Sequence, residues 1–523
     1  MIGLSNSKDY THIYLVLITL MALLLRTLWL GTIPNGFYCD EASNGYDSYS
    51  ILMTMRDRSG DFLPLFVKAF GDYRPSLYVF ITIPFIKILG LNEFAIRLPA
   101  ALIGTLNVVV IYYLVKELFT PKLGLLAALL FAINPWHIQF SRIAFEVILL
   151  PFFFALGILF FVTSFKQSNF LILSAIFFGF SLHTYQSARF FVPLFLIMLI
   201  LIFRNHLWRI KKQTLIASII FILIFIPLFI FWISPEGMAR ARQVKINTNL
   251  IGLTQSYLSY FSPDYLFFNG DSNLRHSPPG IGELYVYELL TVVLGVFYLL
   301  KNGGNPRSIL LLWLFLYPLP AALTGETSAV RSLIGSSIFS IISACGITYV
   351  IVQLKLRNKL LINTIVFFLL TFSISIFWNY YFVKYPLNSA INWDYGYREA
   401  IEYAQKSSYK CVVFSSDTDS QCFAVHGFSV LIPFYIQYPP AQYQLSPIPL
   451  SIKESRANTY SLNKYKLMPI FKHNQFNDQC LYILRPHEIS TLTEKGYTWN
   501  EVHTIKDSNG TEYFKLMEIS RKY

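Results

Sequence analysis

The chain has 523 residues, of which 54% are hydrophobic and 14% charged, and its formal net charge is +13. A soluble domain has about 25% charged residues, so the composition excludes an ordinary soluble globular protein. The positive charge forms no basic patch with interleaved aromatic residues. Membrane topology therefore explains the charge better than a nucleic-acid partner does.

Hydrophobic runs of about 17–25 residues recur up to about Phe377, which is the length that crosses a bilayer as a helix. Because lipid offers backbone groups no hydrogen-bond partner, we expect an all-α polytopic membrane region. The first run is long for a signal peptide and lacks a clear cleavage site, so we interpret it as a retained helix. We predict about eleven spanning helices, at 12–31, 93–116, 122–139, 144–165, 169–186, 190–203, 213–233, 285–301, 307–324, 331–352 and 359–379.

Alternating loops differ in charge. One set is rich in Lys and Arg, with Glu117 as its only acid, and this predicts a cytoplasmic side that includes the N-terminus. The other set mixes acids with Arg and His. Segment 75–90 is short and contains Pro84, and as a span it would invert every later loop. We therefore expect a surface helix there, with 36–58 as a companion juxtamembrane helix and a short true span as the alternative.

The composition changes after about Asn379, and no long apolar run follows. We predict a membrane domain over 1–379, with outer loops at 36–90 and 235–284, and a small extracytoplasmic soluble α/β domain over 380–523. The expected elements of that domain are a helix at 393–406, strands at 410–415, 480–484 and 513–519, and a turn at Asn509-Gly510. Its cysteines, Cys411, Cys422 and Cys480, could include one disulfide.

Two adjacent acids, Asp40 and Glu41, follow the first hydrophobic run. A carboxylate at the outer surface can act as a general base toward a hydroxyl group. The plainer alternative is a solvated acidic pair at a helix N-terminus. Just before the surface helix, Asp72 and Arg74 form a second polar group, in which the guanidinium could bind a lipid phosphate or merely extend toward headgroups.

Further polar residues gather at the ends of the predicted outer helices and in the large outer loop. These residues could contact a substrate. For Arg142 and Glu146 the alternative to substrate contact is an intrahelical ion pair, and for Tyr185 it is anchoring at the membrane interface. An Arg inside a membrane helix is costly unless it is paired or functional, which makes Arg331 the best candidate for a phosphate contact. The candidates for contact with an anionic, sugar-bearing substrate are His137, Arg142, Glu146, Tyr185, Arg189, Arg275, His276 and Arg331.

The order of several motifs resembles the GT-C class of integral membrane glycosyltransferases. The nearest resemblance is to the bacterial branch of the protein O-mannosyltransferase family, which includes the aminoarabinose transferases that modify lipid A. It covers 1–200 well and the region to 379 more loosely, and it departs from the usual pattern at Cys39, Ser76 and Glu146. The motifs are Tyr38-Cys-Asp-Glu-Ala42, Asp72-Tyr-Arg-Pro-Ser-Leu-Tyr78, Gly90-Leu-Asn-Glu-Phe-Ala-Ile-Arg-Leu-Pro99, Lys116-Glu-Leu-Phe119 and His137-Ile-Gln-Phe-Ser-Arg142.

The resemblance implies a multi-pass protein of the cell (plasma or inner) membrane that moves a sugar from a polyprenyl-phosphate donor to an extracytoplasmic hydroxyl, with inversion. It implies Asp40 as the catalytic aspartate, Glu146 as a second acid and Arg74 as the basic residue before the surface helix. The acceptor, whether protein, lipid or glycan, stays open. So does a divalent metal, which some of the class use, because the sequence shows no clear ligand set.

Two other functions compete with transfer. A transporter or flippase of lipid-linked sugars would typically show internal repeats and polar residues at the membrane midplane, and the sequence shows neither. A non-enzymatic membrane scaffold would leave the outer acids, arginines and histidines without a role.

Overall fold

The computed structural model describes residues 10–238, 249–325, 327–353, 359–416, 426–448, 459–473 and 476–521. Their contacts divide the chain into two compact units. The helical unit comprises Met1–Leu28 and Ala100–Phe382, and the mixed unit comprises Trp29–Pro99 and Val383–Tyr523. The sequence-based division near residue 379 groups the first outer loop with the membrane helices. In the structure this loop packs with the C-terminal region instead, because helices from that region cover it.

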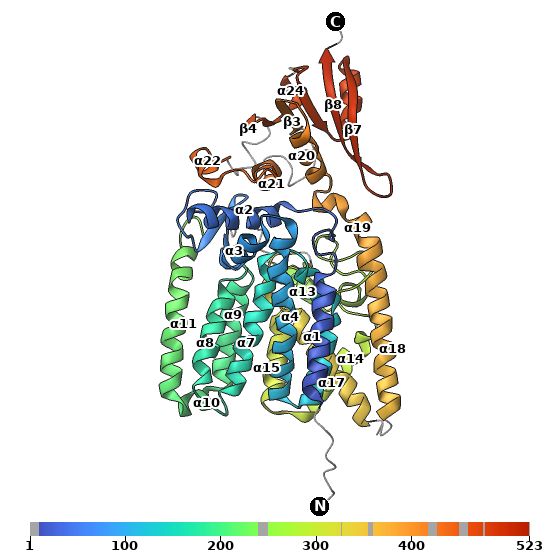
Figure 1. Ribbon diagram of the computed structural model, residues 1–523. Helices are drawn as coiled ribbons and strands as arrows, with labels where there is room; N and C mark the ends of the chain where they lie inside the picture. The colour runs from blue at the N-terminus through green and yellow to red at the C-terminus, as the bar shows by residue number, and fades with distance from the viewer. Residues whose placement is uncertain are drawn as a thin grey trace, which may run out of the picture. The chain divides into compact units, whose positions relative to one another are not determined.

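The helical unit contains long apolar helices that run next to one another, among them α7, α8, α9 and α11 (Figure 1). Its elements are α1 (Thr11–Thr27), α4 (Glu93–Leu118, from Ala100 on), α5 (Pro121–Ile133), α6 (Pro135–Ser141), η1 (Glu146–Ile148), α7 (Leu149–Thr163), α8 (Phe170–Leu182), α9 (Ala188–Ile202), α10 (Arg204–Arg209), α11 (Lys211–Trp232), α13 (Leu250–Ser259), η2 (Asp264–Phe268), α14 (Glu288–Asn302), α15 (Gly304–Leu316), α16 (Leu319–Ala322), α17 (Gly335–Gln353), α18 (Lys359–Phe377) and η3 (Trp378–Lys384).

Five helices of the described residues are long and apolar enough to cross a membrane: Glu93–Leu118, Glu146–Thr163, Lys211–Trp232, Gly335–Gln353 and Phe367–Asn388. A sixth candidate is the pair α5 and α6, which is bent by 61°. Pro135 cannot donate a backbone hydrogen bond, and the Asn134 side chain caps the new helix by accepting from the His137 amide at 2.8 Å. The expected helix 122–139 is therefore broken. The total of eleven spans stays a prediction.

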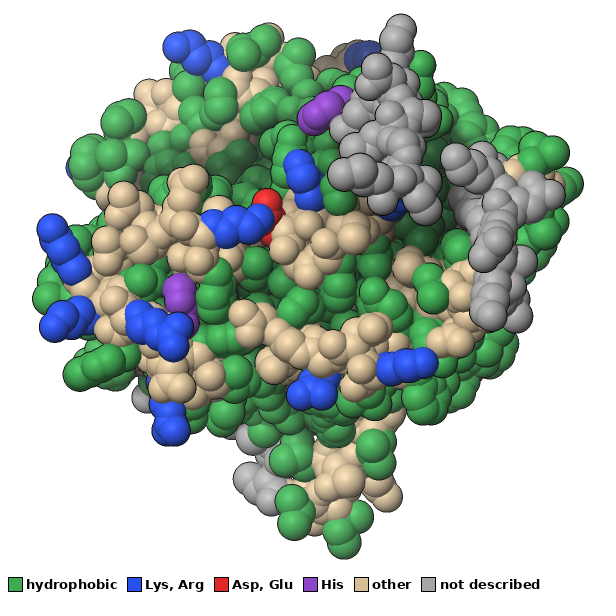
Figure 2. All heavy atoms as spheres, turned by 90° about the horizontal axis from the view of Figure 1, so that it is seen from below, with side chains coloured by type: hydrophobic (Ala, Val, Ile, Leu, Met, Phe, Trp, Pro, Cys, Tyr) green, Lys and Arg blue, Asp and Glu red, His purple; other side chains and the backbone are tan. Residues whose placement is uncertain are grey.

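The face of the helical unit where α10 lies is mostly hydrophobic, with Lys and Arg spread over it and hardly any Asp or Glu in view (Figure 2). Helix α10 itself contributes Arg204 and Arg209. This distribution is typical of a cytoplasmic face, and the orientation of the termini stays a prediction.

The mixed unit contains the first outer loop. Its loop elements are α2 (Cys39–Thr54), β1 (Phe66–Ala69), β2 (Asp72–Pro75) and α3 (Leu77–Leu89), followed by the start of α4. Helices α2 and α3 pack through Ile51 and Val79, and the Ser48 hydroxyl donates to the Val79 carbonyl at 2.9 Å. The helices expected at 36–58 and 75–90 are thus present as α2 and α3. Whether α3 lies along a membrane surface stays a prediction.

The C-terminal part of this unit is a mixed α/β fold. A six-stranded sheet has the order β4-β5-β3-β6-β8-β7, with β3 parallel to β5 and β6 and the remaining pairs antiparallel. Its elements are α19 (Tyr385–Asn388), η4 (Ala390–Trp393), α20 (Tyr397–Lys406), β3 (Cys411–Ser415), α21 (Phe428–Tyr435), α22 (Pro440–Leu445), β4 (Tyr460–Leu462), β5 (Tyr465–Met468), α24 (Ile470–His473), β6 (Cys480–Leu484), α25 (Glu488–Glu494), β7 (Tyr497–Lys506) and β8 (Glu512–Arg521).

The sequence predicted several of these elements, namely β3, β6, β8, α20 and the turn at Gly510, which has a φ of 83°. One disulfide joins Cys411 to Cys480 on the adjacent strands β3 and β6. Cys422, the third cysteine of the predicted set, lies outside the described residues, as do residues 239–248 of the large outer loop.

Candidate functional site

The two adjacent acids open helix α2, where the helix dipole favours negative charge. Their surroundings differ. The Asp40 side chain belongs to a half-buried residue, whereas Glu41 is completely buried. One Glu41 carboxylate oxygen also accepts from the Tyr38 amide at 3.4 Å. The structure therefore separates an accessible acid from a structural one.

Arg97 near the start of α4 holds Glu41 in place. Its Nε and Nη2 donate to the two Glu41 oxygens at 2.8 Å each, and both side chains are inaccessible to solvent. The same guanidinium donates to three backbone carbonyls of the segment before α2, those of Leu30, Pro34 and Gly36, at 3.2, 3.3 and 2.8 Å. One cation thus fixes both the first turn of α2 and the chain that leads into it.

A second guanidinium approaches Asp40 from strand β2. Arg74 pairs with Val67 across the β1–β2 hairpin, and its Nη1 donates to the Asp40 backbone carbonyl at 3.4 Å. Its Nη2 donates to the Ser43 hydroxyl at 2.5 Å and lies 3.6 Å from the Asp47 carboxylate.

Arg58 completes this cluster. Its Nη1 lies 3.2 Å from Asp47 and also donates to the Ser43 hydroxyl. Two guanidinium groups thus share one carboxylate, that of Asp47 in α2. The Nε atoms of Arg58 and Arg74 are buried and have no hydrogen-bond partner among the described residues. Guanidinium groups can bind a further anion by charge-assisted hydrogen bonds, so Arg74 is a candidate for such a contact near Asp40.

Asp57, just beyond the end of α2, is buried as well. The pKa of the Asp57 carboxyl is raised from 3.8 to about 6. Burial is the largest cause, and repulsion from Asp47 is the second largest. Its Oδ1 accepts from the amides of Ser59 and Asp61 at 2.8 and 3.0 Å, so the side chain shapes the turn after the helix.

Asp57→Asn should stabilise the protein at neutral pH, because it keeps an oxygen for the turn and removes a buried charge. Below about pH 4 the carboxyl is protonated in folded and unfolded chains alike, so little gain is expected there. The gain should grow up to about pH 6 and then level off at about 1–3 kcal/mol. Thermal unfolding between pH 4 and 8 measures it, and a gain independent of pH would contradict the raised pKa.

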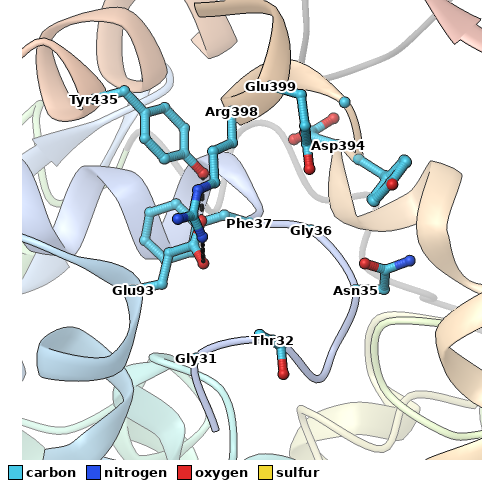
Figure 3. Close-up of a pocket in the computed structure, with 12 residues that line it drawn as sticks. Gly31, Thr32, Asn35, Gly36, Phe37, Glu93, Asp394, Arg398, Glu399 and Tyr435 are labelled. Atoms are coloured by element: carbon cyan, nitrogen blue, oxygen red, sulfur yellow. Dashed lines mark hydrogen bonds and ion pairs between the residues drawn. The ribbon is translucent and has the colours of Figure 1, made fainter. Parts of the chain in front are cut away.

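A cavity of about 100 Å³ lies in the mixed unit beside the segment that leads into α2. Figure 3 shows Tyr435 and Arg398 converging on Glu93 on one side and Asp394 and Glu399 on the other. The Tyr435 hydroxyl donates to Glu93 at 2.6 Å, and Arg398 lies 3.4 Å from the same carboxylate. Burial raises the pKa of Glu399. Gly36 and Phe37 form part of the cavity wall, so this polar pocket adjoins the chain just before Asp40.

The remaining predicted residue of the first loop, Asp72, lies at the start of β2. It is half-buried, and its carboxylate accepts from the Tyr73 amide at 2.7 Å. Asp40, Glu41, Asp72 and Arg74 thus all belong to the mixed unit. The other eight predicted residues belong to the helical unit.

His137 lies in the interior of the helical unit rather than on an outer surface. It is completely buried in α6, with its Nδ1 3.1 Å from Arg26 and its Nε2 3.5 Å from Asn107. The structure places His137 inside the helical unit, and its contact with an anionic ligand stays a prediction. His137 belongs to a buried polar network that includes the break between α5 and α6.

Arg142 and Glu146 lie on either side of a non-helical connection. Helix α6 ends at Ser141 and η1 begins at Glu146, so the alternative of an ion pair within one continuous helix does not hold. The buried Arg142 donates to the carbonyls of Leu25 and Leu28 at 2.9 and 2.7 Å. Its guanidinium also lies over the rings of Tyr381 and Phe382.

Tyr185 and Arg189 lie near the junction of α8 and α9. Both residues are half-buried, and the Arg189 guanidinium lies over the rings of Phe231 and Trp232 from α11. Arg331 lies before α17 and donates to the Thr324 hydroxyl at 2.6 Å. It is thus near the end of a helix rather than within its apolar middle.

Arg275 and His276 belong to an ordered part of the large loop. His276 Nδ1 lies 2.8 Å from Asp271, which also accepts from the amides of Asn273 and Ala329 at 2.8 and 2.7 Å. Burial alone would raise the pKa of Asp271, but these hydrogen bonds outweigh it and hold the pKa below its usual value. Arg275 contacts Asn273 through its Nε at 3.2 Å.

No group of three or more His, Cys, Asp or Glu side chains within the described ranges could hold a metal ion.

Sequence reasoning missed Arg97, Arg58, Asp47 and Ser43 as parts of this site. Arg97 carried a usable signal, since it lies among the first residues of a long apolar helix, where an unpaired cation is costly. The others carried none, because a polar residue in a juxtamembrane loop is ordinarily solvated.

Comparison with known proteins adds independent findings. Residues 73–232 match the family described as dolichyl-phosphate-mannose-protein mannosyltransferase. None of the curated protein sequences matches the chain significantly.

Solved structures give a broader likeness. Apo ArnT from Cupriavidus metallidurans is 12% identical, with a TM-score of 0.59 and 98% of each chain covered. The same protein bound to undecaprenyl phosphate is 11% identical, with a TM-score of 0.56 and the same coverage.

The apo oligosaccharyltransferase of Archaeoglobus fulgidus is 14% identical, with a TM-score of 0.52 over 98% of this chain and 75% of that one. The resemblance predicted from the motif order is therefore confirmed. The chain has the fold of the GT-C membrane glycosyltransferases, and its residues 73–232 carry the sequence pattern of the protein mannosyltransferase family.

Proposed function

We propose that this multi-pass membrane protein transfers a sugar from a polyprenyl-phosphate donor to an acceptor hydroxyl outside the cytoplasm, with inversion at the anomeric carbon. The observation that supports it most is the site around the first turn of α2. There a half-buried carboxylate, Asp40, lies beside the guanidinium group of Arg74, which donates to the Asp40 backbone carbonyl. A structure of ArnT with undecaprenyl phosphate bound supports the choice of donor class.

In this proposal Asp40 takes the proton of the acceptor hydroxyl as its oxygen attacks the anomeric carbon. The bond between that carbon and the phosphate oxygen breaks, and the electron pair leaves with the polyprenyl phosphate. Arg74 stabilises the charge that develops on the phosphate, which is the role of a preorganised cation in a transferase. The products are the glycosylated acceptor, polyprenyl phosphate and a protonated Asp40.

The proposal gives Glu41 a positioning role, since Arg97 occupies its carboxylate. Arg189, Arg275 and Arg331 stay proposed contacts for phosphate or sugar from the helical unit, and so do Tyr185, His276, Arg142 and Glu146. A cytoplasmic N-terminus and an extracytoplasmic C-terminal region complete the proposal. A divalent metal could assist the leaving phosphate, and the chain's own cations could perform the same role.

Arg74 gives a direct test of donor binding. Arg74→Ala should weaken binding of polyprenyl phosphate about 10–100-fold, because a hydrogen bond to a charged group contributes about 1.5–3 kcal/mol. The affinity of Arg74→Lys for polyprenyl phosphate should lie between those of Arg74→Ala and the unmodified protein. Lysine keeps the positive charge but lacks the planar guanidinium group that donates two parallel hydrogen bonds. Binding of a labelled polyprenyl phosphate to purified protein measures the effect.

The matched control is Arg56→Ala, which removes an exposed arginine of the same loop. It should bind the donor lipid like the unmodified protein. Unchanged binding by Arg74→Ala would exclude the cluster as the phosphate site.

A further inference from the structure

The chain just before Asp40 packs against the C-terminal region of the mixed unit. The Phe37 ring lies 4.8 Å from the ring of Phe434 in α21 and 6.2 Å from that of Tyr435. Gly36 has a φ of 117°, and a Cβ there would lie 2.3 Å from the Trp393 carbonyl oxygen. Backbone of the C-terminal region thus approaches the lead-in to α2 so closely that only glycine fits.

The middle of α2 is covered in the same way. A Cβ at Gly45 would lie 2.8 Å from the Phe434 ring, so α21 packs directly on the helix backbone. At the next residue, the Tyr46 hydroxyl donates to the Tyr438 carbonyl at 2.9 Å, and the Tyr46 ring lies 5.5 Å from that of Tyr443. Tyr46 itself is completely buried.

A single side chain of α22, that of Gln444, contacts the C-terminal end of α2. The Gln444 amide nitrogen lies 2.9 Å from the hydroxyl oxygens of Ser50 and Thr54. It also lies 2.9 Å from the Asp57 carbonyl and 3.4 Å from that of Arg56. These four oxygens belong to the last turns of α2 and the turn after it, so Gln444 joins the end of the helix to α22.

We propose that α21 and α22 are a positioning element for the helix that carries Asp40, with Gln444 as its positioning residue. The inference rests on the proposed transfer reaction. A base must lie within hydrogen-bond reach of the acceptor hydroxyl, and a displacement of about 1 Å can cost about 100-fold in rate. Contacts at the start, middle and end of α2 hold it as one rigid body, although the contacting residues lie nearly 400 positions away in the chain.

Three variants test this proposal. Gln444→Leu removes the amide while keeping much of the side-chain volume, and it should lower kcat about tenfold with the KM for the donor unchanged, because only the placement of the base is affected. Gln444→Lys should restore most of kcat, because all four neighbours are oxygen atoms that accept hydrogen bonds and an ammonium group can donate to them. Gln442→Leu, on the exposed side of the same helix, should match the unmodified protein.

Hydrogen exchange of the peptides covering 39–54 provides a readout independent of activity. Exchange should be faster in Gln444→Leu and normal in Gln444→Lys. If Gln444→Leu does not fold, Tyr46→Phe, which removes only the hydroxyl bonded to Tyr438, takes its place with the same expectations.

Unchanged kcat and unchanged exchange in Gln444→Leu would overturn the proposal. So would a raised KM for the acceptor with kcat unchanged, since that result would assign α22 to acceptor binding. If the unmodified protein transfers no sugar from any donor, the proposed function fails. The exchange pattern then still decides whether α22 holds α2.

Discussion

Asp40→Asn is expected to reduce the rate of sugar transfer about 10²–10⁴-fold, the usual contribution of a general base. Asn has nearly the same shape as Asp but cannot accept a proton. The Asp40 contact with Arg74 uses a backbone carbonyl and survives the change. Binding of the donor should therefore stay close to normal while kcat falls.

The measurement is single-turnover transfer by purified protein, with binding of polyprenyl phosphate measured on the same samples. Asp61→Asn is the matched control, because Asp61 is an exposed acid of the same loop whose carboxylate lies 3.4 Å from the exposed Lys68. Transfer by Asp40→Asn at the normal rate would exclude Asp40 as the base. A loss of both transfer and donor binding would indicate a structural role instead.

Arg97→Leu is expected to have the largest effect on stability. It leaves the Glu41 carboxylate buried without its partner, and breaking a buried pair in this way costs about 3–5 kcal/mol. It also removes the donor to the carbonyls of Leu30, Pro34 and Gly36. Glu41→Leu should cost less, because Arg97 then keeps those three carbonyls.

Thermal unfolding in detergent, compared between variants at one pH, measures this difference. Arg398→Leu is the control, since it removes a half-exposed arginine of the same unit that pairs with Glu93 and Glu402. The pair with Glu402 is exposed and contributes about 0–1 kcal/mol, and the buried Glu93 keeps its hydrogen bond from Tyr435, so this variant should lose much less stability than Arg97→Leu. Equal stability of Arg97→Leu and Arg398→Leu would contradict the role given to Arg97.

Hydrophobic run length predicted most helices of the membrane region to within a few residues, because each run must bury its backbone polar groups internally. The break at Asn134 was missed, although Asn-Pro is a recognised turn and capping signal. Because the residues on both sides of Asn134 are mostly apolar, the length of the hydrophobic run does not show the break. The C-terminal strands β3, β6 and β8 were predicted from short β-rich runs, whereas β4 and β5 are too short to show a pattern.

The candidate site was only partly accessible to sequence reasoning. Asp40 and Arg74 stood out because charged residues next to a membrane helix are costly. The separate environments of Asp40 and Glu41 depend on Arg97, which is 56 residues away from Glu41 in the sequence. The contact of α2 with Gln444 spans nearly 400 residues. Such pairings follow from the three-dimensional packing, and no local pattern encodes them.

Transfer of a sugar from a lipid phosphate is tested most directly by measuring both products of the reaction. Purified protein is incubated with polyprenyl-phosphate sugars of defined anomeric configuration and an extract of acceptor-bearing cell envelope. Release of polyprenyl phosphate and the anomeric configuration of the new linkage are then measured. We predict release that depends on Asp40 and a linkage of inverted configuration. Movement of intact donor across vesicles without release of polyprenyl phosphate would contradict transfer and support a flippase.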